Sequence, residues 1–140
     1  MSTESNKAAA RRFHELFNAN QLDSIRDELF THESVIHFAG MPPMNIEAFK
    51  QVGIMFRQGF PDLRSEVVDQ IAEGDKVVTR IVSTGTHTGA FQGIPATGKP
   101  IRVEGILIER YANGRIVERW DQFDQLGMLQ QLGVIPVPQS

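Results

Sequence analysis

The chain contains no cysteine and little excess charge, and each of these absences excludes a class of function. With no Cys among its 140 residues, disulfide bonds, thiolate nucleophiles and cysteine-ligated metals are excluded. The formal net charge of −3 at pH 7 argues against nucleic acid and anionic membranes as partners. No apolar run approaches the ~20 residues of a membrane-spanning helix, and residues 1–7 lack a signal-peptide pattern. We therefore expect a cytoplasmic protein.

The length and composition are typical of one soluble globular domain. Hydrophobic residues make up 41% of the chain and charged residues 22%, which is an ordinary mixture. A domain of this size buries roughly 68–70% of the surface of its unfolded chain, enough for a core and a cavity. Because no repeat, low-complexity block or internal linker interrupts the sequence, we expect a single domain over residues 1–140.

The first half of the chain has the spacing of helices. An apolar stripe from Ala9 to Phe17 predicts one helix. Asp23 is a candidate N-cap for a second, short helix, and Asn45 for a third. Between these two caps, residues 34–38 form a short β-rich segment that turn-forming residues end.

In the second half the apolar spacing changes to the pattern of strands. Residues 112–114, Ala-Asn-Gly, give the strongest turn signal and predict a hairpin. Asp124 is placed to cap a last helix that Gly133 ends. Three helices followed by antiparallel strands predict an α+β fold, with the helices packed on one face of a curved sheet. The expected strands are 67–71, 77–82, 101–111 and 116–123.

Asp121 is the strongest catalytic candidate, because it lies inside a predicted strand, where Asp is disfavoured. Strand alternation places Arg119, Asp121 and Phe123 on one face. A carboxylate on a concave face beside apolar groups is harder to ionise, and such a group can move protons between carbon and oxygen near neutral pH. The alternative from the residues alone is that Asp121 pairs with Arg119 or lies on a solvated face.

Three other acidic residues near Asp121 are interpreted as structural. Asp124 precedes the last helix and is interpreted as its N-cap. Glu104 and Glu109 lie on the partner strand and are interpreted as surface charges. The sequence does not decide which of them faces Asp121, because a bulge at Gly114 would shift the hairpin register.

The four histidines, His14, His32, His37 and His87, predict no metal site, because no pair has the spacing of ligands. His37 can point inward from the short strand, and His87 lies where a strand gives way to a glycine-rich loop, as a pocket-rim residue would. Taken alone, each is more typical of a hydrogen-bonded structural residue.

Two segments resemble the signatures of SnoaL-like polyketide cyclases (ester cyclases) of the NTF2-like superfamily: residues 85–99, and residues 113–121 with Asp124 and residues 131–133. The resemblance extends from about Ser5 to about Pro136. It implies an NTF2-like cone around a pocket, a homodimer, and cofactor-free, metal-free aldol cyclisation of polyketide methyl esters. The acid/base aspartate of the family corresponds to Asp121. The implied pocket residues are His37, His87, Gly105, Leu107, Arg119 and Phe123.

The chain also departs from the family pattern. Characterised cyclases carry Gln and His beside the aspartate, where this chain has Gly105 and Leu107, and an Asn of the early strand is His37 here. Three hypotheses therefore stay open. The first is acid/base catalysis (cyclase, isomerase or lyase) on a small hydrophobic carbonyl compound. The second is small-molecule binding without catalysis, favoured by Gly105 and Leu107. The third is epoxide hydrolysis, which needs two carboxylates and an arginine.

Overall fold

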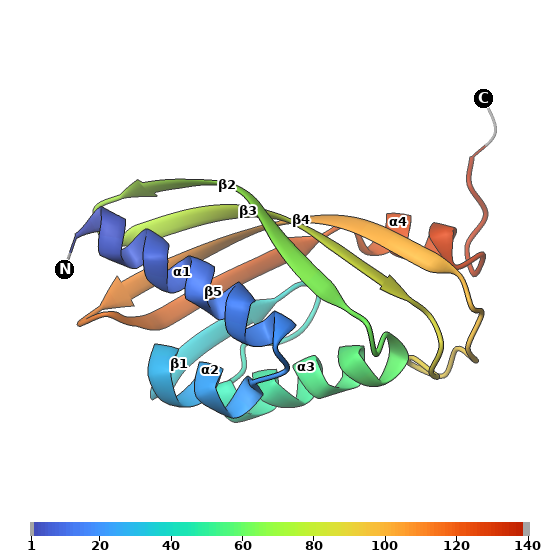
Figure 1. The fold of residues 1–140 in the computed structure, drawn as a ribbon, viewed down its shortest axis with the longest axis horizontal. Coiled ribbons are helices and arrows are strands. Elements are labelled where there is room, and N and C mark those ends of the chain that lie inside the picture. The colour runs from blue at the N-terminus through green and yellow to red at the C-terminus, as the bar shows by residue number, and fades with distance from the viewer. Residues whose placement is uncertain (1, 139–140) are drawn as a thin grey trace.

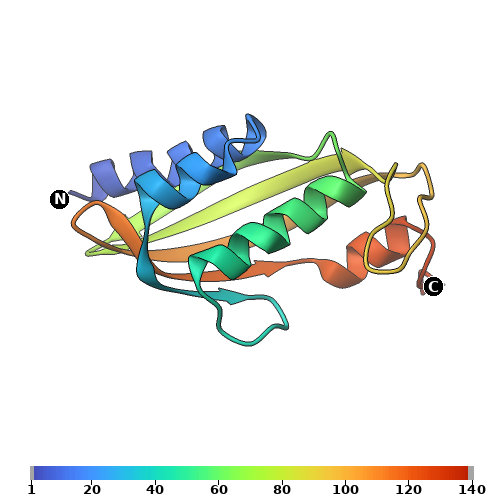
Figure 2. The same cartoon turned by 90° about the horizontal axis from the view of Figure 1, so that it is seen from below.

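Helices cover the concave side of a curved five-stranded sheet (Figures 1 and 2). The computed structural model describes residues 2–138, and the predicted α+β fold is confirmed. Within this range no helix combines the length and apolar composition needed to cross a bilayer. The elements are α1 (Thr3–Asn18), α2 (Leu22–Leu29), β1 (Phe30–Phe38), α3 (Ile46–Gly59), β2 (Arg64–Glu73), β3 (Lys76–Thr86), β4 (Pro100–Ala112), β5 (Arg115–Phe123) and α4 (Gln125–Gln131).

Two of the three predicted helix caps are confirmed. The side chain of Asn45 accepts a hydrogen bond from the Ala48 N–H at 2.9 Å, and that of Asp124 accepts from the Gly127 N–H at 2.8 Å, so each satisfies an otherwise free donor of the first helical turn. The prediction for Asp23 is wrong. α2 begins two residues earlier than predicted, after Gln21, whose side chain makes no capping bond, and Asp23 lies in the first turn.

The sheet order is β1-β5-β4-β3-β2, and β1 pairs with β5 in parallel. The sequence predicted only antiparallel strands, because a parallel partner far along the chain leaves no turn signal. In the β4–β5 hairpin the register shifts by a bulge between Arg110 and Tyr111, which places Glu109 opposite Arg119 and Leu107 opposite Asp121. The extra residue lies on β5, where it brings Arg119 and Asp121 onto the inner face, whereas Glu109 faces inward by the regular alternation of β4.

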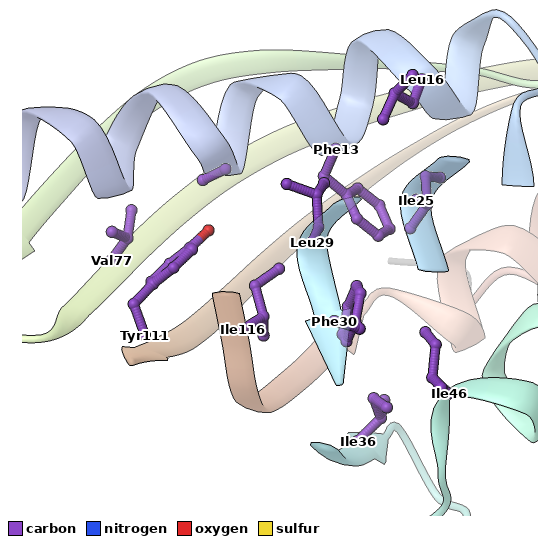
Figure 3. Packing of buried hydrophobic residues seen from close by; sticks show 11 residues of the cluster. Phe13, Leu16, Ile25, Leu29, Phe30, Ile36, Ile46, Val77, Tyr111 and Ile116 are labelled. Atoms are coloured by element: carbon purple, nitrogen blue, oxygen red, sulfur yellow. The ribbon is translucent and has the colours of Figure 1, made fainter. Parts of the chain in front are cut away.

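Two apolar clusters fill the space between helices and sheet. The larger joins α1, α2 and β1 to the sheet, where Phe13 meets Phe30 with ring centroids 6.3 Å apart and Tyr111 lies beneath α1 (Figure 3). The smaller cluster lies at the other end of the sheet and includes Phe60, Phe91 and residues of α4. Since both clusters contribute walls to one pocket, packing of the core also shapes the candidate site.

The loop between β3 and β4 is fixed by one aromatic side chain. Phe91 is 1% exposed and lies against Phe56 and Phe60, with ring centroids 4.9 and 5.4 Å away. The loop approaches the end of α3 so closely that a Cβ on Gly59 would lie 2.8 Å from the Cβ of Phe91, and one on Gly89 would overlap the Gln58 carbonyl oxygen. Both glycines are therefore needed for this contact. Figure 2 shows the loop beside α4.

Candidate active site

An apolar cavity of about 130 Å³ opens between the inner face of the sheet and helices α1 and α3. Most of its wall is aromatic and aliphatic, with few polar side chains, which is the usual composition of a small-molecule site. Its polar lining residues are His14, Ser65, Ser83, Arg119 and Asp121. The phenylalanines of the wall are Phe13, Phe17, Phe38, Phe49, Phe56 and Phe123.

Asp121 is held at the cavity wall by a buried ion pair. Its Oδ2 accepts a hydrogen bond from Arg119 Nε at 2.8 Å, and the residue is 7% exposed. The other carboxylate oxygen, Oδ1, accepts no hydrogen bond from residues 2–138. The pair fixes the orientation of the carboxylate and leaves one oxygen for chemistry. Both readings of Asp121 from the sequence are therefore compatible with the structure, because the residue pairs with Arg119 and also lines the cavity.

Arg119 also binds Glu109, so the three side chains form a buried triad. Arg119 Nη1 donates to Glu109 Oε2 at 2.9 Å, and the hydroxyl of Tyr111 donates to Glu109 Oε1 at 3.2 Å. Glu109 is fully buried and Arg119 is 3% exposed. The interpretation of Glu109 as a surface charge is wrong. Alternation along β4 turns its side chain inward together with Leu107 and Tyr111, while Glu104 stays exposed as expected.

The charges of the triad do not balance when all three groups are ionised, since two carboxylates surround one guanidinium. Burial raises the pKa of Glu109, and the nearby Asp121 adds to this, while the charge of Arg119 opposes it. Burial disfavours the cation of Arg119, but the attraction of Asp121 and Glu109 outweighs it and raises the guanidinium pKa. Burial thus favours the protonated form of Glu109, which would reduce the charge imbalance of the triad.

Aromatic rings hold the guanidinium of Arg119 in place. Its central carbon lies 4.0 Å from the ring centroid of Phe13 and 5.2 Å from that of Phe49. Cation–π contacts of this kind strengthen when water is excluded. Helices α1 and α3 are therefore joined to the ion pairs of the sheet through one side chain.

His14 of α1 adds a neutral polar group to the cavity wall. Its Nδ1 lies 3.1 Å from the hydroxyl of Ser65. Burial lowers the pKa of His14 to about 3, with a further contribution from the charge of Arg119. The ring therefore stays uncharged throughout the physiological pH range.

Four of the predicted site residues meet at the cavity: Gly105, Arg119, Asp121 and Phe123. Leu107 is fully buried opposite Asp121, beneath the wall. His37 is not part of the cavity. It lies on the other face of the sheet, stacked on Trp120 at 5.4 Å and paired with Glu118 at 2.8 Å, because strand alternation turns Phe38 inward instead.

His87 is also outside the cavity wall. Its Nδ1 accepts a hydrogen bond from the Thr97 N–H at 3.2 Å, and its ring stacks on Phe60 at 5.2 Å. It therefore braces the loop that carries Phe91. Within residues 2–138, no three His, Cys, Asp or Glu side chains gather in a way that would hold a metal ion.

Two titratable residues of the site, Glu109 and His14, were not predicted from the sequence. Glu109 had a signal, because alternation along residues 101–111 places it on the same face as Leu107 and Tyr111. His14 also had a signal, because it lies on the apolar stripe of the first helix between Phe13 and Phe17. A histidine on the buried stripe of a helix is expected to face the core or a cavity.

The pKa of His14 predicts that the protein loses stability in acid. Unfolded His titrates near ~6.5, whereas folded His14 titrates at about 3. Between these values the unfolded chain binds a proton that the folded chain does not. The contribution of neutral His14 to the free energy of unfolding is therefore complete above pH ~6.5 and decreases as the pH falls. We expect His14→Phe to remove a pH-dependent term of about 4 kcal/mol between pH 7 and pH 3.

The measurement is urea unfolding of wild type and His14→Phe across this pH range. His32→Phe, at an exposed position on β1, is the control and is expected to follow wild type. Parallel stability curves for wild type and His14→Phe would contradict the prediction.

The sequence of this chain matches a known family. The family profile described as SnoaL-like polyketide cyclase matches residues 7–132. The chain belongs to the SnoaL-like polyketide cyclase family. Among curated relatives of this SnoaL-like chain, the aklanonic acid methyl ester cyclase DnrD of Streptomyces peucetius is 28% identical over 128 residues, covering 88% of this chain and 87% of that protein. The family supports a cyclase-type function.

Solved structures agree with the assignment to SnoaL-like cyclases. IdmH of Streptomyces antibioticus superposes with a TM-score of 0.83 at 36% identity, covering 92% of this chain and 99% of that one. TsrD of Streptomyces laurentii gives a TM-score of 0.85 at 26% identity, covering 96% and 99%. The NTF2-like cone expected for this SnoaL-like chain is thus confirmed over nearly its whole length.

Proposed function

We propose that this protein is a cyclase-type enzyme in which Asp121 acts as general acid and base on a small hydrophobic carbonyl compound. The reaction is an intramolecular aldol cyclisation, or related isomerase or lyase chemistry. The observation that carries the proposal is the carboxylate of Asp121 at an apolar cavity. One of its oxygens is fixed by Arg119, and the other has no partner among residues 2–138.

In this mechanism Asp121 takes a proton from the carbon between two carbonyl groups of the substrate. The resulting enolate attacks a second carbonyl within the same molecule and forms the new carbon–carbon bond. Asp121 then returns its proton to the developing alkoxide, so the enzyme ends in its starting state. The delocalised enolate carries much of its own charge, and for this reason the proposal needs no metal or cofactor.

The surroundings of Asp121 favour this chemistry in two ways. The ion pair with Arg119 keeps the carboxylate oriented, so the reacting atoms meet in a defined geometry. The aromatic wall excludes water, which protects the enolate from solvent. The cavity of about 130 Å³ is smaller than the ~300–1,000 Å³ of typical ligand sites, so a large substrate would extend through its mouth.

The test is turnover of aklanonic acid methyl ester, the compound in the names of the curated relatives, by wild type and Asp121→Asn. We expect the variant to lose about 10²–10⁴-fold in rate, the usual contribution of a general acid or base. The product is followed by liquid chromatography with mass spectrometry. Folding of the variant is expected to survive, since the Glu109–Arg119 pair that remains is balanced in charge.

Asp69→Asn is the matched control. Asp69 also pairs with an arginine, Arg80 at 3.1 Å, but on an exposed part of the sheet. It is expected to turn over substrate as wild type does. Wild-type turnover by Asp121→Asn would refute the role of Asp121.

A second candidate function is small-molecule binding without catalysis. Leu107 lies directly opposite Asp121, and Gly105 lies opposite Phe123, so these two β4 positions offer the carboxylate no polar side chain. Tight binding of the ester by wild type with no product formed would favour this alternative over the cyclase.

Epoxide hydrolysis is less well supported. Glu109 supplies the second carboxylate that this reaction needs, beside Arg119 and Asp121. Both of its oxygens, however, are engaged by Arg119 and Tyr111, and the side chain is fully buried behind the cavity wall. It is therefore poorly placed to activate a water molecule for attack on an epoxide.

We also propose that two copies of the chain pair through the outer face of the sheet. Ile106 and Ile108 of β4 are 51% and 36% exposed on this face, and Ile108 lies beside Trp120. A second copy would cover these apolar side chains. Sedimentation should give twice the monomer mass of 15.7 kDa, reduced to the monomer by Ile106→Lys. A monomeric wild type would refute the pairing.

A further inference from the structure

His14, a residue of the cavity wall, has a buried side-chain nitrogen without a partner in residues 2–138. The residue is 4% exposed, and its Nε2 makes no hydrogen bond within residues 2–138. Buried polar groups in folded proteins are nearly always paired, so each exception needs an explanation. Three other side-chain atoms in the described range share this condition, on Asn6, Arg57 and His87, but none of those residues lines the cavity.

The neighbours of His14 decide which of its nitrogens carries the hydrogen. The hydroxyl of Ser65, itself 4% exposed, lies 3.1 Å from Nδ1 and has no other partner in residues 2–138. If Nδ1 carried the hydrogen, the hydroxyl hydrogen of Ser65 would be buried without an acceptor. If Ser65 donates to Nδ1, both groups are satisfied and the hydrogen of the ring lies on Nε2. The second arrangement leaves fewer buried groups unpaired.

We propose that His14 Nε2–H donates a hydrogen bond to a carbonyl oxygen of the ligand in the cavity. This inference rests on the proposed function only in taking the ligand to be a carbonyl compound. A donor at this point both selects ligands with an acceptor oxygen and stabilises negative charge that develops on that oxygen. Because the ring is neutral and its orientation is fixed by Ser65, the donor is present before the ligand arrives.

The proposed role of His14 also gives the cavity a hydrogen-bond donor that the apolar β4 residues beside Asp121 do not supply. Gly105 and Leu107 supply no donor, and two nitrogens of Arg119 are occupied by Asp121 and Glu109. The donor instead comes from α1, the helix above the sheet. His14 is thus a specificity-determining residue, and Asp121 is the group that moves the proton.

The test compares two ligands of nearly equal shape, 1-tetralone and tetralin, of which only the first has a carbonyl oxygen. Binding of each is measured by NMR titration to wild type, His14→Phe and His14→Gln. We expect wild type to prefer 1-tetralone by about tenfold beyond the preference of His14→Phe, the usual effect of one buried hydrogen bond. His14→Gln, which keeps an N–H donor, should retain most of the preference, and Ser65→Ala should weaken it.

The ratio of the two affinities separates a lost hydrogen bond from a general loss of fold, because misfolding weakens both ligands together. An unchanged preference in His14→Phe would overturn the proposal and indicate Arg119 or Ser83 as the donor. A ¹⁵N spectrum that places the ring hydrogen on Nδ1, or binding of neither ligand, would also overturn it. Asp69→Asn, on an exposed part of the sheet, is expected to keep the preference. The readout is equilibrium binding, so the outcome for His14 is independent of catalysis by Asp121.

Discussion

Replacing Arg119 with Met is expected to lower the free energy of unfolding by about 3–5 kcal/mol at pH 7. The substitution leaves Glu109 and Asp121 buried without a cation, although Met fills much of the same space. Removing one partner of a buried ion pair is costly because the remaining charge is no longer compensated. Urea unfolding followed by the fluorescence of Trp120, the single tryptophan, measures the loss.

Two further variants show whether charge imbalance is the cause. Glu109→Gln leaves the balanced pair of Arg119 and Asp121, so it should destabilise much less than Arg119→Met. Lowering the pH should recover part of the stability of Arg119→Met, since protonation removes the buried negative charge. Arg80→Met, which breaks the exposed pair with Asp69, is the matched control and should change little. Equal losses in the two Arg→Met variants would contradict the explanation.

Phe91→Ala is expected to lower the free energy of unfolding by a similar amount, about 3–5 kcal/mol. Phe91 is 1% exposed and is the side chain through which the loop between β3 and β4 enters the smaller apolar cluster. Its removal leaves a cavity against Phe56 and Phe60 that nearby backbone fills poorly, because Gly59 and Gly89 already lie in close contact. Thermal and urea unfolding measure the effect.

The loss of stability should depend on how much of the buried side chain at position 91 is removed. Phe91→Leu keeps most of the buried volume and should recover a large part of the stability. Leu126→Ala removes an apolar side chain that is 56% exposed and should have little effect. If Phe91→Ala were no worse than Leu126→Ala, the loop would not be fixed by Phe91.

The fold and about half of the site residues could be predicted from the sequence, because they depend on interactions between residues that are close along the chain. The caps at Asn45 and Asp124 follow from side-chain chemistry next to a helix. The shared face of Arg119 and Asp121 follows from strand alternation. Neither requires knowledge of distant parts of the chain.

The errors involve contacts between distant segments or a register shift. Glu109 lies opposite Arg119 only because of the register shift between Arg110 and Tyr111. His37 faces outward because β1 pairs in parallel with β5, which places Phe38 beside Asp121 on the inner face. His14 becomes a site residue only when α1 packs over Ser65 of β2. Sequence reasoning therefore found the carboxylate of Asp121 and its partner Arg119, and missed Glu109 and His14.

The contacts of Arg119 with Phe13 and Phe49 divide the aromatic wall into two parts for protein engineering. These two rings hold the guanidinium, so shortening either would disturb the charges as well as the shape. Phe38 and Phe56 line the same cavity, and within residues 2–138 neither ring makes a cation–π contact with an arginine. Truncating them would widen the cavity while the carboxylate keeps its setting. A library directed at these two positions is therefore the rational starting point for changing which substrates the scaffold accepts.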